Sequence, residues 1–145
     1  MNIQVMNRQE AIQYCHQRHD EETCIISIYT PVEEYHDEPF MSTIIGNGVY
    51  EILRVGFFDV DLGNKGAIDK DMADMIADTV ERNKNRKIIV HCDLGASRSV
   101  GVAAALAKFY NNDDMEYFNT PNMIPNMRCY RYVLNALVKN YGLKF

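Results

Sequence analysis

The chain has 145 residues, of which 47% are hydrophobic, so it can bury the core of one compact domain, and its composition argues against intrinsic disorder. Its 15 lysines and arginines against 20 aspartates and glutamates give a net charge of −5, which argues against a globally basic nucleic-acid-binding protein. No apolar run approaches the roughly 18 residues of a membrane span, and no basic stretch followed by an apolar one opens the sequence. We therefore expect a cytoplasmic protein without a nucleic-acid or membrane partner. The four cysteines are widely spaced, which indicates free thiols rather than a disulfide framework: Cys15, Cys24, Cys92 and Cys129.

The first sixty residues predict strands that are separated by one helix and one long loop. Asn7 precedes Glu10 by three residues, a spacing typical of a capping box that opens a helix. Residues 24–30 are apolar and β-branched, as in a buried strand, and Pro31 ends them. In chain order we expect a strand at 1–6, a helix at 8–18, a strand at 24–30, a loop at 32–47 and one or two strands at 49–60.

The rest of the chain alternates predicted helices with one further strand. Apolar residues from Met72 to Val80 recur at helical spacing, and Asp69 stands where an N-cap belongs. We expect a helix at 69–83, a strand at 87–92, a helix at 95–110, a loop at 119–126 and a helix at 127–141 that Gly142 ends in a left-handed conformation. This order predicts one α/β domain over residues 1–145, with a central, mostly parallel sheet flanked by helices.

The most informative segment is HCDLGASRS, from His91 to Ser99, which joins the apolar strand to the following helix. A tight turn between a strand and a helix points successive backbone amides inward, and the helix dipole makes that position favourable for a phosphate dianion. We expect the amides from Asp93 to Arg98 to form this cradle, and the Arg98 guanidinium to hold two phosphate oxygens. The residues expected to supply amides are Asp93, Leu94, Gly95, Ala96, Ser97 and Arg98.

Cys92 lies at the base of the expected cradle, where the same amides and Arg98 would favour a thiolate. A thiolate there could attack a bound phosphate ester and form a thiophosphate intermediate. Ser99 could donate a hydrogen bond to the sulfur and assist its departure. The side chain of Asp93 is expected to face outward.

His91, Cys92, Gly95, Arg98 and Ser99 fit the pattern HCxxGxxRS, which resembles the signature of the cysteine-based protein tyrosine phosphatases and, with its SRS ending, their compact dual-specificity branch. The resemblance runs from about residue 25 onward and includes the segment 124–137. It implies a phosphatase fold with the signature loop between a strand and a helix, and hydrolysis of phosphomonoesters without a metal or other cofactor. It also implies a phosphorylated protein substrate, which carries phosphotyrosine or, as the dual-specificity branch accepts, phosphoserine or phosphothreonine. The resemblance further implies a supporting role for His91 in holding Cys92 ionised.

Members of this family use an aspartate about thirty residues before the cysteine as general acid, and later as base. Two residues fit, Asp59 and Asp61, and in an extended segment both point to the same side. We favour Asp59, because the acid of this family usually closes a strand of the form apolar-x-x-x-Asp, which residues 55–59 fit, and keep Asp61 as the alternative.

Other substrates and another class of function remain open at this point. The same chemistry could act on RNA 5′-phosphates, phosphoinositides or other small phosphate esters, although the net charge of −5 argues weakly against RNA and anionic membranes. A pseudophosphatase that binds phosphate without turnover is the alternative class. The sequence leaves the oligomeric state open and is compatible with a monomer.

Overall fold

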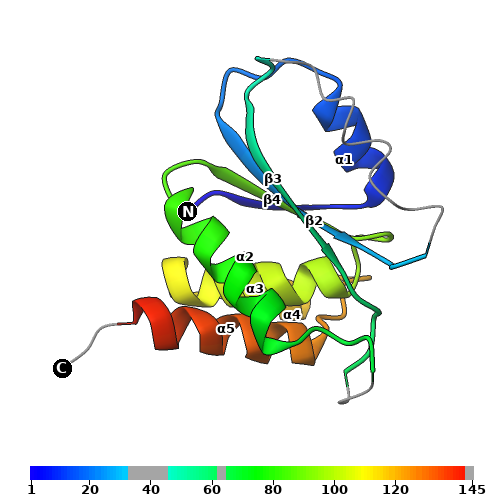
Figure 1. Ribbon diagram of the computed structural model, residues 1–145, viewed down its shortest axis with the longest axis vertical. Coiled ribbons are helices and arrows are strands. Elements are labelled where there is room, and N and C mark those ends of the chain that lie inside the picture. The colour runs from blue at the N-terminus through cyan, green and yellow to red at the C-terminus, as the bar shows by residue number, and fades with distance from the viewer. Residues whose placement is uncertain (33–45, 62–64, 143–145) are drawn as a thin grey trace.

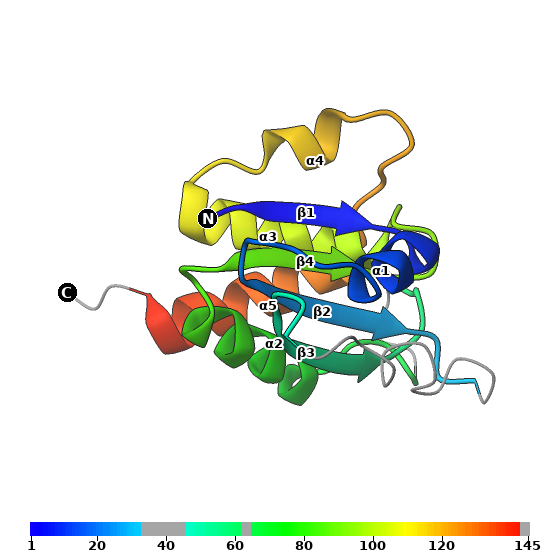
Figure 2. The ribbon, with the colours of Figure 1, turned by 90° about the horizontal axis from the view of Figure 1, so that it is seen from above.

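The computed structural model describes residues 1–32, 46–61 and 65–142, which form an α/β fold (Figure 1). Four strands form one sheet in the order β1-β4-β2-β3, and all three strand pairs are parallel (Figure 2). The strands are β1 (Ile3–Met6), β2 (Thr23–Tyr29), β3 (Val49–Gly56) and β4 (Lys87–His91). The helices are α1 (Arg8–Cys15), α2 (Lys70–Arg82), α3 (Arg98–Asn111), α4 (Met115–Asn119) and α5 (Met127–Tyr141). The expectation of a mostly parallel sheet between helices is confirmed.

Both faces of the sheet are covered, because apolar residues occupy both sides of the central strands. On β2, Ile26 and Ile28 join the core under α2, α3 and α5, whereas Ile25 joins a smaller core under α1. Figure 1 shows α1 on one side of the sheet and α2, α3 and α5 on the other. Strands buried on both faces are typical of parallel sheets, which explains the nearly continuous apolar runs of β2 and β4.

The predicted starts of three helices are confirmed. Asn7 and Glu10 form the capping box of α1, and the Asp69 carboxylate accepts a hydrogen bond from the Met72 amide at the start of α2. The helix α5 has the predicted bounds, and Asn126 caps it.

The predicted ends of the helices are less accurate. The helix α1 ends at Cys15 rather than at residue 18, because the buried Asn47 side chain donates hydrogen bonds to the carbonyls of Cys15 and Gln17. Gly142 has φ −66°, so the prediction of a left-handed residue there was wrong. Instead Asn112, with φ 56°, ends α3 in that conformation.

The sequence did not predict the short helix α4, which has too few residues to show a period, and only one of its side chains, Tyr117, is buried. Most of the predicted loop at 32–47 lies outside the described residues. Among the helices that are described, none combines the length and the apolar character that crossing a lipid bilayer requires.

The parallel arrangement brings the carboxyl ends of β2, β3 and β4 to one edge of the sheet, where α3 begins. Such an edge is the usual ligand site of open α/β sheets. The helix α5 begins near the same edge, because Gly101 of α3 packs directly on it. A Cβ atom at Gly101 would clash with the Asn126 carbonyl oxygen, so only glycine permits this approach.

Candidate active site

The loop of residues 92–97, here called the Cys92 loop, joins β4 to α3 and packs against the end of β1. Gly95 has φ +68°, and a Cβ atom there would lie 2.9 Å from the backbone of Met6 and Asn7. The Asp93 carbonyl accepts a hydrogen bond from the Arg8 amide at 3.2 Å. The loop conformation therefore depends on a glycine and on the N-terminal segment that supports it.

The N-terminus of α3 points into this loop and is not capped by a side chain. Ser97 is the N-cap residue, but its hydroxyl makes no capping bond and donates instead to Asp59 Oδ1 at 2.8 Å. The first-turn amides of α3 are thus left to a ligand, and with the helix dipole they favour an anion. An uncapped helix N-terminus at this loop is compatible with the predicted cradle, and the role of the individual amides stays a prediction.

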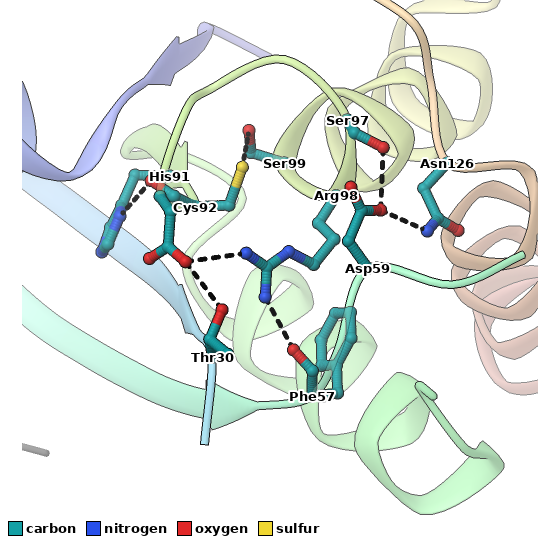
Figure 3. A network of polar contacts seen from close by, with 10 residues as sticks. Thr30, Phe57, Asp59, His91, Cys92, Ser97, Arg98, Ser99 and Asn126 are labelled. Carbon is teal, nitrogen blue, oxygen red and sulfur yellow. Dashed lines mark hydrogen bonds and ion pairs between the residues drawn. The ribbon is translucent and has the colours of Figure 1, made fainter. Parts of the chain in front are cut away.

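Cys92 lies at the base of the loop, 2% exposed, with its sulfur 3.1 Å from the Ser99 hydroxyl oxygen (Figure 3). Two other cysteines differ from it in their surroundings. Burial raises the pKa of Cys24 to about 12, and burial raises the pKa of Cys129 well above its usual value. These two thiols stay protonated in the core. Cys92 instead lies beside the Ser99 hydroxyl at the N-terminus of α3.

The Arg98 side chain is 6% exposed and is held at two points (Figure 3). Its Nη1 donates to the Phe57 carbonyl at 2.7 Å, and its Nη2 donates to Asp93 Oδ2 at 3.1 Å. The expectation that the Asp93 side chain faces outward was wrong. The carboxylate turns toward Arg98 because a buried guanidinium needs a paired counter-charge.

The two candidate general acids occupy different positions. Asp59 Oδ1 accepts hydrogen bonds from Ser97 and from Asn126 Nδ2, each at 2.8 Å, which places this carboxylate beside the Cys92 loop (Figure 3). Asp61 Oδ1 instead accepts from the Met127 amide at 2.9 Å, at the start of α5. These hydrogen bonds place Asp59 beside the Cys92 loop and Asp61 at the N-terminus of α5.

His91 is buried, and both of its ring nitrogens lie within hydrogen-bond distance of a partner. Its Nε2 lies 2.6 Å from Ser27 Oγ, and its Nδ1 lies 3.2 Å from the Cys92 carbonyl oxygen. Burial lowers the pKa of His91 to about 4, so the ring is neutral near neutral pH. The contact with Cys92 is therefore a hydrogen bond to the loop backbone and carries no positive charge.

Sequence reasoning missed four residues that contact the site: Ser27, Thr30, Phe57 and Asn126. Ser27 is the one polar side chain in the middle of β2, and it pairs in register with His91. Asn126 stands before a predicted helix, a position where asparagine is favoured as an N-cap. Ser27 and Asn126 could therefore have been identified from the sequence pattern. Phe57 contacts Arg98 through its backbone carbonyl, which no sequence pattern marks.

Within the described residues, no three His, Cys, Asp or Glu side chains gather in a way that could hold a metal ion. Arg98, Cys92 and the α3 amides are suited to an oxyanion and not to a cation.

No family model and no curated protein matches this sequence, whereas solved structures match it over nearly its whole length. The Cydia pomonella PTP-2 phosphatase has a TM-score of 0.59 at 16% identity, covering 93% of this chain and 85% of that one. The structure of PTPMT1 in complex with PI(5)P has a TM-score of 0.59 at 12% identity, covering 95% and 91%. Tk-PTP in its active form has a TM-score of 0.56 at 17% identity, covering 95% and 90%. This chain has the fold of the protein tyrosine phosphatases. The likeness covers 93–95% of this chain and concerns its fold.

Proposed function

We propose that this protein is a metal-independent phosphomonoester hydrolase of the protein tyrosine or dual-specificity phosphatase type. One observation carries the proposal: Cys92 lies at the base of a loop that ends in an uncapped helix N-terminus, with the Arg98 guanidinium held beside it. A nucleophile and an oxyanion site are thus combined in one loop, as phosphoryl transfer to a cysteine requires.

In the first step the Cys92 sulfur attacks the phosphorus, and the bond from phosphorus to the ester oxygen breaks. The loop amides and Arg98 hold the three equatorial oxygens, whose charge redistributes in the transition state. Asp59 gives its proton to the leaving oxygen, so that an alcohol or phenol departs. Among the described residues the hydrogen bonds to Asp59 all go to Oδ1, which leaves Oδ2 to carry this proton.

In the second step a water molecule attacks the phosphorus of the cysteinyl phosphate, and the Asp59 carboxylate takes a proton from it. The bond from phosphorus to sulfur breaks, and inorganic phosphate forms. The sulfur leaves as a thiolate, which the Ser99 hydroxyl stabilises as a hydrogen-bond donor at 3.1 Å.

The surroundings of the loop favour a single phosphate on a protein side chain as the substrate. Leu94 and Ile124 are 82% and 78% exposed, and the Ile124 amide donates to the Ala96 carbonyl, so both apolar side chains flank the loop. Residues 55–61 and 119–127 contain no lysine or arginine, and besides Arg98 the described contacts bring Arg8 to the loop, through the hydrogen bond from its amide to the Asp93 carbonyl. Recognition of several phosphates, as in RNA, needs further cations. A phosphoinositide is the second candidate, since PTPMT1 of the same fold was crystallised with PI(5)P.

The test is phosphate release from an aryl phosphate in excess chelator, with wild type compared against Cys92→Ser. We expect turnover in the wild type and none in the variant, which should still bind the oxyanion tungstate. Turnover that survives in Cys92→Ser would refute the nucleophile, and loss of activity in chelator would point to a metal enzyme.

If neither folded protein shows turnover but both bind tungstate, the protein is a phosphate-binding pseudophosphatase. If the wild type is active, phosphotyrosine and phosphoserine peptides are compared with PI(5)P. Faster hydrolysis of PI(5)P than of the peptides would show that the preferred substrate is the lipid and not a phosphoprotein.

A further inference from the structure

We infer that Asp93, anchored by Thr30, is a positioning residue that orients the Arg98 guanidinium toward the phosphate. The inference rests on the proposed function in one respect, the role of Arg98 as the phosphate-binding cation.

The Asp93 carboxylate joins two parts of the site through one oxygen atom. Its Oδ2 accepts a hydrogen bond from Thr30 Oγ1 at 2.7 Å and another from Arg98 Nη2 at 3.1 Å. Thr30 follows β2 directly, so the carboxylate is tied to the end of a central strand. Arg98 is thereby linked to the sheet through a residue of its own loop.

The other end of the guanidinium is fixed to the neighbouring strand. Arg98 Nη1 donates to the carbonyl of Phe57, which follows β3, and the Phe57 amide donates to the Tyr29 carbonyl at 3.1 Å. The ends of β2 and β3 thus form one hydrogen-bonded platform, and each holds one Nη of the arginine.

This arrangement is needed because an arginine side chain is flexible and costly to bury. Its many rotamers must be restricted before its planar fork can meet two phosphate oxygens, and its charge loses hydration in the core. Asp93 meets both needs, since it supplies a counter-charge and a fixed direction. The cost is that a carboxylate beside the loop repels a phosphate dianion.

These two effects of Asp93 have opposite signs, so one measurement separates them. If repulsion dominated, removal of the carboxylate would tighten oxyanion binding. If positioning dominates, as we infer, Asp93→Ala weakens tungstate binding about tenfold and lowers kcat/KM by about 10- to 100-fold, the range for hydrogen bonds to charged groups. Asp93→Asn, which keeps one acceptor oxygen, should show a smaller loss.

Thr30 provides a test that leaves the charge of the site unchanged. Thr30→Val removes the hydroxyl while keeping the shape, and we expect it to lower kcat/KM in the same direction as Asp93→Ala but less. Thr30→Ser keeps the hydroxyl and should restore wild-type values. Asp20→Asn, at an exposed position outside the site, is the control for losing one carboxylate and should leave both readouts unchanged.

The deciding experiment is a double-mutant cycle between Asp93→Ala and Arg98→Lys, measured by calorimetric tungstate affinity and by kcat/KM. If Asp93 acts through Arg98, its removal has little further effect once Arg98 is replaced. Equal effects in both backgrounds, or tighter tungstate binding by Asp93→Ala, would overturn the inference. Absence of turnover in the wild type would instead refute the proposed function, and the tungstate cycle would still decide the role of Asp93. If Asp93→Ala does not fold, the cycle is run with Thr30→Val.

Discussion

The Ser99 hydroxyl lies 3.1 Å from the Cys92 sulfur, on the first turn of the helix whose N-terminus faces the loop. Both side chains are buried, so this contact is shielded from water. A hydroxyl in this position stabilises a thiolate more than a sulfur bonded to phosphorus, because a charged acceptor makes the stronger hydrogen bond.

We therefore predict that Ser99→Ala slows breakdown of the cysteinyl phosphate more than its formation. Steady-state kcat should fall by about 10- to 100-fold, the effect of one hydrogen bond to a charged group. Rapid-mixing kinetics with an aryl phosphate should show a burst of phenol release followed by a slow phase. A variant in which the burst itself becomes slow, with no later slow phase, would place Ser99 in the first step.

Substitution of Asp59 should lower kcat, whereas substitution of Asp61 should lower the free energy of unfolding. Asp59→Asn should lower kcat by about 10²- to 10⁴-fold, the usual range for a general acid, and less for aryl phosphates with acidic leaving groups. Asp61→Asn removes a charge that accepts from the Met127 amide, so it should lower the free energy of unfolding by about 0.5–2 kcal/mol, as loss of an N-cap does. Its kcat should stay near the wild-type value. The reverse pattern would assign the acid to Asp61.

The part of the site that the sequence predicts is the part that is continuous in the chain. His91 to Ser99 form a strand end, a loop and a helix start, and their geometry follows from local rules on amides and helix dipoles. The apolar, β-branched runs of β2 and β4 and the caps at Asn7 and Asp69 are equally local. These features are found as predicted.

What the sequence could not predict depends on contacts between distant residues. In an extended segment Asp59 and Asp61 point to the same side, so the sequence pattern does not separate them. Their hydrogen-bond partners do: Asp59 accepts from Ser97 and Asn126, whereas Asp61 accepts from the Met127 amide. The orientation of Asp93 likewise depends on Thr30, which is separated from it in the chain by β3, α2 and β4. Such pairings are set by the register of the sheet, which no local pattern encodes.

Gly95 should tolerate alanine poorly for two separable reasons. Its φ of +68° strains any side chain, and a Cβ atom would meet the Met6 and Asn7 backbone at 2.9 Å. Gly46 offers a matched control, since its φ is +73° but nothing lies within 4 Å of the added atom. We predict that Gly46→Ala costs only the backbone strain, about 1–3 kcal/mol, whereas Gly95→Ala costs more and also weakens tungstate binding. Equal unfolding free energies and unchanged tungstate affinity would show that the loop does not depend on this close approach.

His91 should make the stability of the fold fall as the solution becomes acidic. Burial depresses its pKa from 6.5 to about 4 in the folded state, so below pH 6.5 the unfolded chain takes up a proton that the folded protein does not. The contribution of neutral His91 to the free energy of unfolding is fully present above about pH 6.5, falls progressively below that value, and is lost by the folded pKa of about 4.

One pKa unit corresponds to about 1.4 kcal/mol, so this histidine alone should remove about 2 kcal/mol of unfolding free energy between about pH 7 and about pH 5. Denaturant unfolding at both pH values measures the loss, and His91→Asn, whose amide can still donate toward the Cys92 carbonyl, is the reference. We expect the variant to lose about 2 kcal/mol less than the wild type over the same interval. Equal losses would mean that the folded protein protonates His91 as readily as the unfolded chain does, which its burial between Ser27 and the loop backbone argues against.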